Sequence, residues 1–558
     1  MNHRGLNGGL PPVPESPVPV LQDTGQGVTV YYKNRYLYSR VRPDSAVSRM
    51  VSSLSIRPET LVCCFSPALD YGLEALLERL PENAAVLAVE HDTALYELAL
   101  SRLPVRVRND LRFSFIHAGS LDTVREYLAS RDPGTIRRCI SVDMSGGTAL
   151  YPGFYHSIIP MIDEMISRFW KNRMTLVRMG RLYSRNLFRN LGRVPGSRRF
   201  MPSSVCRPIL VLGAGPSLDS GLEKVLSFGD SFFIIAVDSA LNPLLKRGIL
   251  PDCVIALESQ LANEKAFIGA AGSRIDLLAD LTSRGQIIAV LGGEPTFFFS
   301  EFADTGFLRK LRSLKVLPVS IPALGSVGVA AVYLALSLRA NNAPVFFAGL
   351  DFSYLPGKTH CRESPAHRMA LDSADRLSPD GNPAAAYREG CFPISGKNGK
   401  RFISDPALCG YGQLFCSCFS TAAALYDLGD SGVNTGRPLC TEDEAAGIVL
   451  DWNQRHHGGG AWDRAPFMDT DDPGLARRIR ELFDSEEEAL LLLRRFLITG
   501  EGTPDEVLGL LENREYLYLH FPDGHKKPSA DTGFLKRVRS EIDFFLKDIR
   551  IARLLLDG

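Results

Sequence analysis

Long apolar runs are missing from this chain of 558 residues, and no window reaches the ~18 uninterrupted apolar residues of a membrane-spanning helix. The first twenty residues contain Pro and Gly but no apolar stretch of the kind found in a secretion signal. Cysteine is also sparse, with 11 residues. This number is too small for a disulfide framework in a chain of this length. We therefore expect a cytoplasmic protein without a membrane span.

Charge of one sign is not in excess either, because 63 Lys and Arg residues stand against 63 Asp and Glu residues. A basic excess is typical of proteins that bind nucleic acid, so we expect no nucleic-acid partner. The apolar fraction of 45% and the charged fraction of 23% are ordinary for a globular protein. At roughly 100–200 residues per domain, the length predicts about three or four domains.

Short apolar strands alternate with amphipathic helices in two stretches of the chain. This pattern predicts an α/β fold with two Rossmann-like, doubly wound domains in tandem. After a hairpin at 27–41, strands of the first domain are predicted at 61–65, 86–90, 112–118 and 139–143. Strands of the second domain are predicted at 208–212, 232–237, 253–257, 287–291, 314–319 and 344–350. Three helical stretches after residue 473 predict a C-terminal helical bundle.

The chain is expected to divide into five parts. They are a flexible tail at 1–24, a degenerate Rossmann-like domain at 25–152, a helical connector at 153–204, a central domain at 205–440 and a helical domain at 441–558. Within the central domain, the segment 352–405 is rich in Pro, Gly, Ser and charge, and it predicts a lid or binding loop. Asn398-Gly399 between two apolar runs predicts a hairpin inside this segment. A helix is predicted over 407–428, and 430–470 is expected to be irregular.

The strongest motif is GAGPSL at 213–218, which follows a predicted buried strand and opens a helix. Gly213 and Gly215 permit a tight turn, Pro216 suits the first helical turn, and Ser217 offers a hydroxyl group. The free N–H groups and the positive end of such a helix favour a phosphate. A plain strand–helix turn is the alternative. A dinucleotide fingerprint is excluded because Leu218 stands where it needs Gly.

Three carboxylates follow predicted strands, namely Asp238, Glu258 and Asp351. Because ligands bind at the carboxyl ends of parallel strands, we expect these acids to gather with the glycine loop in a nucleotide or nucleotide-sugar crevice. There they would bind hydroxyl groups or hold Mg²⁺ against phosphates. His360 lies on a loop shortly beyond Asp351, and its ordinary pKa suits a general base. A loop histidine that bonds to backbone is the alternative.

Several segments together resemble the motility-associated factor (Maf) flagellin glycosyltransferases. They are GAGPSL, IIAVDSALNPLLKRGILPDCVIALES, GSVGVAAVYLA and FAGLDFSY followed by GKTH, in this order over 205–430. The central domain of that family is shared with archaeal 6-hydroxymethylpterin diphosphokinase (MptE-like) proteins, and it is similar to sialyltransferases that use CMP-sialic acid. The flanking domains are also Maf-like, so the resemblance covers nearly the whole chain.

The resemblance implies transfer of a nonulosonic acid, of pseudaminic or legionaminic type, from its CMP-activated form to Ser or Thr hydroxyls of flagellin. The implied reaction is inverting and requires no metal or other cofactor. Catalysis is assigned to Asp351 and to His360 as the base. The donor nucleotide is assigned to Gly213, Gly215, Pro216, Ser217, Asp238, Glu258, Ser326 and Tyr354. Many relatives have Asp where Glu258 stands, which argues against a metal ligand at this position.

Two other functions stay open at this point. One is an ATP-dependent 6-hydroxymethylpterin diphosphokinase with Asp238, Glu258 and Asp351 around Mg²⁺, although a small-molecule kinase has no need of the flanking domains. The other is a non-catalytic chaperone that binds flagellin. The N-terminal domain is expected to bind no cofactor, because the segment 64–68 lacks the Gly that a cofactor loop needs.

Overall fold

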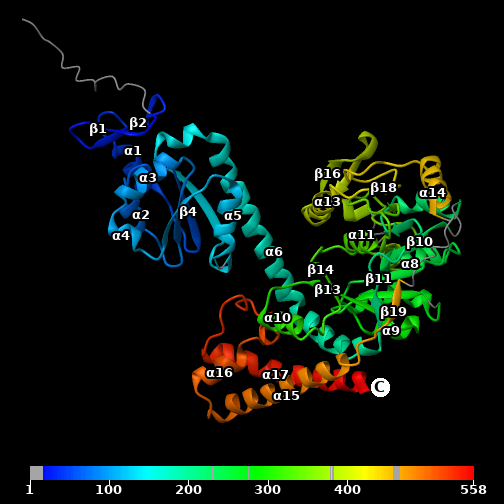
Figure 1. Ribbon diagram of the computed structural model, residues 1–558. Helices are drawn as coiled ribbons and strands as arrows, with labels where there is room; N and C mark the ends of the chain where they lie inside the picture. Colours follow the sequence, from blue (N-terminus) through cyan, green and yellow to red (C-terminus); the bar gives the residue numbers. More distant parts are fainter. Residues whose placement is uncertain are drawn as a thin grey trace, which may run out of the picture. The chain divides into compact units, whose positions relative to one another are not determined.

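The computed structural model describes residues 17–131, 133–227, 231–273, 275–377, 379, 383–456 and 466–557 (Figure 1). The chain divides into two compact units, Met1–Leu176 and Val177–Gly558. The division falls inside α6 (Pro152–Leu191), a helix of 40 residues. The helical conformation predicted for this segment is therefore confirmed. The five-part division predicted from the sequence stays a prediction.

The first unit is built on a four-stranded parallel sheet in the order β6-β5-β4-β7, as the alternation of strands and helices predicted. Alternate residues of β4 point to opposite faces, so Val62 and Cys64 enter one apolar core while Leu61 and Cys63 enter the other. The elements of this sheet and its helices are β4 (Thr60–Phe65), α2 (Leu73–Glu78), β5 (Ala85–Glu90), α3 (Thr93–Arg102), α4 (Val105–Arg108), β6 (Phe113–His117), α5 (Leu121–Ala129) and β7 (Arg138–Asp143).

The segment before this sheet corrects one prediction. The tail was expected to extend to residue 24, but β1 (Val20–Asp23) pairs antiparallel with β2 (Val28–Tyr32). Residues 1–16 of the predicted tail lie outside the described residues. The predicted hairpin is confirmed, because β2 pairs antiparallel with β3 (Arg35–Tyr36). Helix α1 (Ser45–Ser53) follows and buries Val47 and Val51.

The second unit contains a ten-stranded sheet in the order β18-β15-β9-β10-β11-β12-β13-β8-β19, with β14 also paired to β13. Its neighbouring strands are parallel except for β19, which pairs antiparallel with β8. The strands are β8 (Arg198–Phe200), β9 (Ile209–Leu212), β10 (Phe233–Val237), β11 (Cys253–Ala256), β12 (Asp276–Asp280), β13 (Thr296–Glu301), β14 (Val319–Pro322), β15 (Val345–Ala348), β18 (Leu425–Asp427) and β19 (Phe467–Asp469). The predictions of β9, β10, β11 and β15 are confirmed.

Two predicted strands of this sheet are wrong. Residues 287–291 form most of helix α9 (Gln286–Leu291), in which Ile287 and Leu291 are buried one helical turn apart. The run at 314–319 is not a strand, and β14 begins only at its last residue. Strands β12 and β13 fill these places in the sheet. A short apolar run does not by itself distinguish a buried strand from one turn of a buried helix.

The segments that follow the strand β15 also differ from the prediction. The hairpin at the Asn-Gly turn is confirmed as β16 (Phe392–Ser395) and β17 (Arg401–Ser404). The helix expected over 407–428 ends early, since α13 (Pro406–Phe419) is followed by the edge strand β18. The segment 430–470, expected to be irregular, contains α14 (Glu442–His456) and β19. Of the two adjacent histidines there, His456 stacks on Trp452 in α14, and His457 lies outside the described residues.

Helices cover both faces of the large sheet. They are α7 (Leu218–Ser227), α8 (Asp238–Leu245), α9, α10 (Gly306–Ser313), α11 (Val327–Leu338), α12 (Pro365–Asp372) and α13. The predicted C-terminal helices are confirmed as α15 (Leu475–Thr499), α16 (Pro504–Leu511) and α17 (Thr532–Asp557). They do not form a separate core, because Ile479 and Phe545 share one cluster with Val254 and Phe297 of the sheet. The C-terminal helices therefore belong to the same packed body as the sheet.

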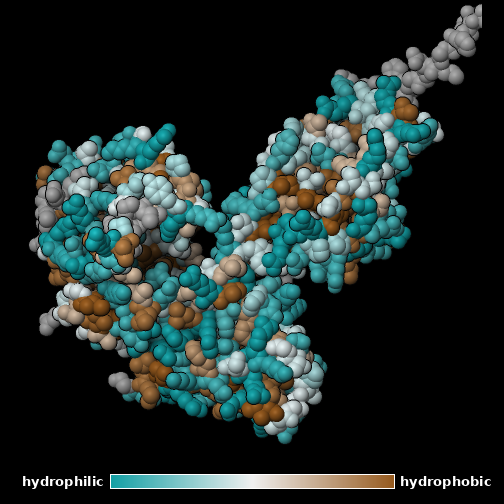
Figure 2. Space-filling view, turned by 180° about the vertical axis from the view of Figure 1, so that it is seen from behind, coloured by the Kyte–Doolittle hydropathy of each residue, from teal (hydrophilic) through white to brown (hydrophobic). Residues whose placement is uncertain are grey.

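None of the helices within the described residues is both long enough and apolar enough to cross a membrane. The face in Figure 2 is largely hydrophilic, with separate patches of hydrophobic side chains. Scattered apolar groups of this kind are normal on a protein surface.

Candidate functional site

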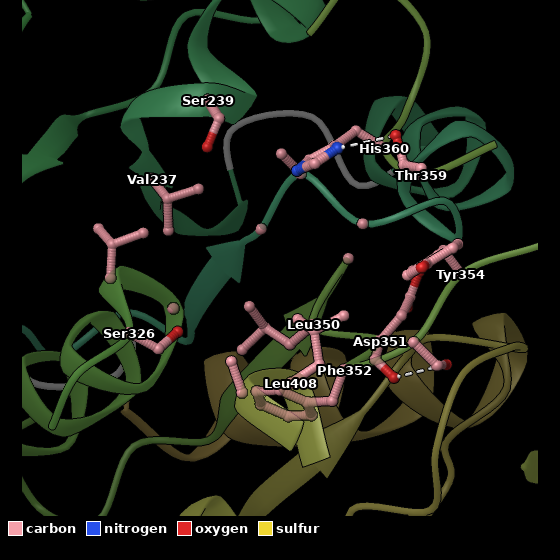
Figure 3. A pocket seen from close by; sticks show the side chains of 18 of the residues that line it. Val237, Ser239, Ser326, Leu350, Asp351, Phe352, Tyr354, Thr359, His360 and Leu408 are labelled. Carbon is pink, nitrogen blue, oxygen red and sulfur yellow. Dashed lines mark hydrogen bonds between the residues drawn. The ribbon is translucent and has the colours of Figure 1, made fainter. Parts of the chain in front are cut away.

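A cavity of about 450 Å³ lies at the carboxyl ends of the neighbouring strands β15, β9 and β10 (Figure 3). Ligands of open parallel sheets bind in this place. Four segments form its walls: the glycine loop at 213–215, the start of α11, the segment 349–360 after β15, and the start of α13. The lining is completed by Val237 and Ser239 at the end of β10 and the start of α8, and by Ala385 and Arg388 in the segment between α12 and β16.

The structure brings together six of the ten site residues that were predicted from the sequence. The cavity is lined by Gly213, Gly215, Ser326, Asp351, Tyr354 and His360. The other four, Pro216, Ser217, Asp238 and Glu258, are not among its lining residues. In Figure 3, Ser326 and Val237 lie on one side of the cavity, and Asp351, Tyr354 and His360 lie on the other.

The glycine loop differs from a phosphate loop in one respect, because three of its N–H groups already have acceptors within the protein. The N–H groups of Gly213 and Gly215 each donate over 2.8 Å, to the carbonyls of Ala348 and Gly349. The N–H of Ser217 donates to Oδ2 of Asp351 over 2.7 Å. A carboxylate of the chain itself thus occupies the start of α7, where a phosphate was expected.

The two glycines permit the close approach of two strand ends. A Cβ atom on Gly215 would lie 2.6 Å from Oδ2 of Asp351 and 2.7 Å from the carbonyl oxygen of Gly349. A Cβ atom on Gly213 would also meet the carbonyl of Gly349. The turns after β9 and β15 therefore interlock, and this contact fixes the position of Asp351 at the cavity.

We expect Gly215→Val to destabilise the protein, because its side chain would collide with a backbone carbonyl and a buried carboxylate. Overpacking of this kind costs about 1–3 kcal/mol. Chemical denaturation of the purified variant measures the loss. Gly410→Ala in α13 is the matched control, because nothing lies within 4 Å of its added Cβ and Ala favours a helix. Equal stability of the Gly215→Val variant and the wild type would contradict the interlocked arrangement.

Asp351 is part of a buried polar cluster beneath the glycine loop. The hydroxyl of Ser217 donates to Oδ1 of Asp351, and both residues are under 5% exposed. Burial raises the pKa of Asp351 to about 6, although the Ser217 hydrogen bonds and the nearby Lys397 ammonium oppose this rise. At pH 7 the carboxyl group is therefore mostly ionised, but it takes up a proton more readily than an ordinary Asp.

Lys397 supplies the positive charge of this cluster, and its side chain is only 8% exposed. Its Nζ lies 2.8 Å from Oδ2 of Asp427, at the end of β18, and it donates to the carbonyl of Gly429 over 2.9 Å. Thr435 donates its hydroxyl to the same Asp427 oxygen over 2.7 Å. The turn between β16 and β17 is thereby fastened to the edge of the large sheet.

His360 is held over the glycine loop by its own neighbours in the chain. The N–H of Cys361 donates to the carbonyl of Ala214 over 2.9 Å, and Nδ1 of His360 lies 3.2 Å from Oγ1 of Thr359. Burial, with a smaller effect of nearby His367, lowers the pKa of His360 below the usual 6.5. The imidazole is therefore neutral at pH 7 and able to accept a proton.

Ser326 marks the start of a helix whose first turn opens on the cavity. It is the N-cap residue of α11, its side chain makes no capping hydrogen bond, and the first turn contains no acidic residue. Val327 and Gly328 line the cavity beside it. The first N–H groups of a helix have no partner within the helix, and they favour an anion. Unlike the start of α7, this helix start is not capped by a carboxylate within the described residues.

Asp238 and Glu258 follow neighbouring strands but stand apart from the cavity lining. Oδ1 of Asp238 accepts hydrogen bonds from the N–H of Ser239 over 2.6 Å and from its hydroxyl over 3.0 Å. Burial raises the pKa of both acids, and the charge of Asp238 adds to the rise at Glu258. No group of three His, Cys, Asp or Glu side chains placed to hold a metal ion occurs within the part of the chain that the structure describes.

Two comparisons of sequence place the chain among known proteins. The family model described as "6-hydroxymethylpterin diphosphokinase MptE-like" matches residues 185–357. An uncharacterized protein of Treponema pallidum (strain Nichols) is 33% identical over 563 residues, which cover 97% of this chain and 96% of that protein. The chain belongs to the MptE-like family. A second uncharacterized protein of the same organism is 28% identical over 115 residues, which cover 19% of this chain and 55% of that protein.

The fold of this MptE-like protein is similar to that of a solved structure, described as the MAf glycosyltransferase from Magnetospirillum magneticum AMB-1. The TM-score is 0.57 at 14% identity, and the match covers 97% of this chain and 90% of that one. At this level of identity, the likeness shows that the two proteins share a fold. The MptE-like family and the α/β fold class expected from the sequence are thus confirmed.

Sequence reasoning missed several residues that shape the cavity of this MptE-like protein. Lys397 stands directly before the predicted Asn398-Gly399 turn and was given no role, and Asp427 fell inside the helix predicted over 407–428. Arg388 and Asp405 line the cavity and lie within the segment 352–405, whose composition predicted a lid or binding loop without singling out either residue. The available signal for Asp405 was its position directly before Pro406, a pair typical of a helix start. In the structure, Asp405 caps α13 by accepting the N–H groups of Ala407 and Leu408.

The acids after the second strand of the N-terminal sheet have protein partners. Glu90 is fully buried and accepts the hydroxyl of Ser66 over 2.7 Å and that of Tyr155 over 2.9 Å. Asp92 forms an ion pair with Lys33 over 2.7 Å and also caps α3. In the MptE-like protein these acids connect the hairpin, the sheet and α6 within the first unit.

Proposed function

We propose that this protein is a glycosyltransferase that transfers a nonulosonic acid from a CMP-activated donor to Ser or Thr hydroxyls of flagellin. The fold shared with the MAf glycosyltransferase and the sequence motifs support this function. The observation that carries it is the position of a neutral His360 at the wall of a cavity whose opposite wall holds the open start of α11. A base and an anion site then face each other across the space for a substrate.

The donor phosphate would bind at the first turn of α11, with Ser326 as a hydroxyl donor. Its charge is complementary to the positive helix end. As the bond to CMP breaks, negative charge grows on the departing phosphate, and the same N–H groups stabilise it. The glycine loop contributes the shape of the wall, since the N–H groups of Gly213 and Gly215 are engaged with β15 and the turn after it.

In the proposed step, the acceptor hydroxyl oxygen attacks the anomeric carbon of the donor. The bond between this carbon and the phosphate oxygen breaks, its electron pair leaves with CMP, and the configuration inverts. The hydroxyl proton passes to Nε2 of His360. For Nε2 to accept it, Nδ1 must carry the ring hydrogen and donate it to Oγ1 of Thr359, which lies at a suitable 3.2 Å.

The second candidate is diphosphate transfer from ATP, which the name of the matching family model favours. This reaction would use Asp238, Glu258 and Asp351 around Mg²⁺. Both oxygens of Asp351 already accept hydrogen bonds from Ser217, and Oδ1 of Asp238 accepts two from Ser239, so a metal ion would have to share these oxygens.

An assay of the purified protein separates the two candidates. Under the glycosyl transfer proposal, CMP is released from CMP-N-acetylneuraminate or a related CMP-nonulosonate in the presence of flagellin, and EDTA does not stop it. Under the kinase alternative, ATP is consumed with 6-hydroxymethylpterin, and EDTA abolishes the reaction. Flagellin binding without turnover of either substrate would instead favour the chaperone function.

A further inference from the structure

Arg388 is the one Lys or Arg among the described residues that line the cavity. It follows a 3-10 turn, Pro383–Tyr387, in the segment between α12 and β16. Its Nε donates to the carbonyl of Ala385 over 3.3 Å, and the hydroxyl of Tyr354 donates to the same carbonyl over 2.9 Å. The guanidinium and the Tyr354 hydroxyl are thus held together at one wall.

The charge of Arg388 is only loosely balanced by the protein. Its ion pair with Oδ2 of Asp405 is long, at 3.5 Å, while Oδ1 of Asp405 accepts the N–H groups of Ala407 and Leu408. The Arg388 side chain remains 61% exposed. Because a guanidinium carries five N–H donors in a planar fork, this arrangement leaves donors for an anionic group in the cavity.

The wall that carries Arg388 is not the wall that carries the start of α11. Tyr354, which shares the Ala385 carbonyl with Arg388, lies across the cavity from Ser326 in Figure 3. The cavity therefore offers two separate features for anions, a helix start and a guanidinium. A substrate with a single phosphate would use one of them, and a substrate with a second anionic group would use both.

We propose that Arg388 binds the carboxylate of the transferred sugar and so selects donors that carry one. This proposal rests on the proposed function. In a CMP-nonulosonate the carboxylate is attached to the anomeric carbon, so a contact with Arg388 orients the reacting centre on the side of the cavity where His360 and Asp351 lie. A guanidinium and a carboxylate pair well through two parallel hydrogen bonds.

Calorimetric titration with CMP and with CMP-N-acetylneuraminate tests this assignment in the full-length protein. Arg388→Ala should weaken binding of the CMP-sugar by about 10- to 100-fold, the usual loss for hydrogen bonds to a charged group. It should change the affinity for CMP less than about twofold, because CMP lacks the carboxylate. Arg388→Lys should recover only part of the loss, since an ammonium cannot form the two-point contact. Arg376→Ala, at an exposed arginine of the same segment, is the control.

The outcomes separate this proposal from the function on which it rests. Equal losses for CMP and for the CMP-sugar would assign Arg388 to the phosphate and overturn the carboxylate contact. Unchanged affinity for both ligands would remove Arg388 from the site while leaving the proposed function intact. A wild-type protein that binds neither ligand would overturn both. Thermal unfolding of each variant shows whether its fold is retained.

Discussion

Replacing His360 with Ala should lower the rate of the proposed sugar transfer by about 10²–10⁴-fold, the contribution of a positioned general base. A Ser or Thr hydroxyl is a poor nucleophile until its proton is accepted. The affinity for CMP should change little, because in the proposed function the imidazole acts on the acceptor and the phosphate binds at the start of α11. Single-turnover rates and CMP titrations of the variant measure the two effects separately.

The pH dependence of the wild-type rate gives an independent check on His360. Only the neutral imidazole accepts a proton, so the rate should fall as the pH drops through the pKa of His360. Because burial and His367 lower this pKa, the fall should lie below the ordinary 6.5. In His367→Ala the fall should move back toward higher pH, since a neighbouring positive charge is removed.

His156→Ala is the control for these measurements, because this histidine is exposed on α6 in the other unit. It should leave both the rate and its pH dependence unchanged. A His360→Ala enzyme with wild-type turnover would exclude His360 as the base. Asp351 would then be the next candidate, since it lines the cavity and its pKa is raised to about 6.

The sequence predicted those strands of the large sheet that are apolar throughout and end at a polar or glycine-rich turn. β9, β10, β11 and β15 have this pattern, and all their residues are buried. The pattern failed at α9, because five apolar residues in a row fit one buried helical turn as well as a strand. A run of five residues is too short for its hydrophobic periodicity to distinguish a helix from a strand.

The position of the cavity was predictable, because it follows from the edge of the sheet at which the parallel strands end. Gly213 and Asp351 follow β9 and β15, so topology alone brings them together. Their contacts were not predictable, because the junctions at 213–218 and 325–328 both contain Gly and Ser before a helix. The tertiary contact between Asp351 and Ser217 shows that a carboxylate occupies the start of α7. No side chain caps the start of α11. Arg388 and Lys397 lie in loops, and the sequence does not reveal that these loops fold back to the edge of the large sheet.

Replacing Lys397 with Met should destabilise the second unit by about 3–5 kcal/mol at pH 7.5, the cost of removing one partner from a buried ion pair. Asp427 would keep a buried charge without its cation, and Asp351 would lose the same nearby charge. The free energy of unfolding from urea titration measures the loss. Lys400→Met is the matched control, because Lys400 is exposed on the same hairpin.

The pH dependence of this loss distinguishes an electrostatic role of Lys397 from simple packing. Lys397 lowers the pKa of both Asp351 and Asp427, so these values should rise in the Met variant. As the pH falls from 7.5 to 5.5, the carboxyls of the variant take up protons in the folded state and no longer need a cation. The stability difference from wild type should therefore shrink, and Asp427→Asn in the Lys397→Met background should reduce it at pH 7.5 as well. A loss that stays the same at both pH values would show that Lys397 acts through its packing alone.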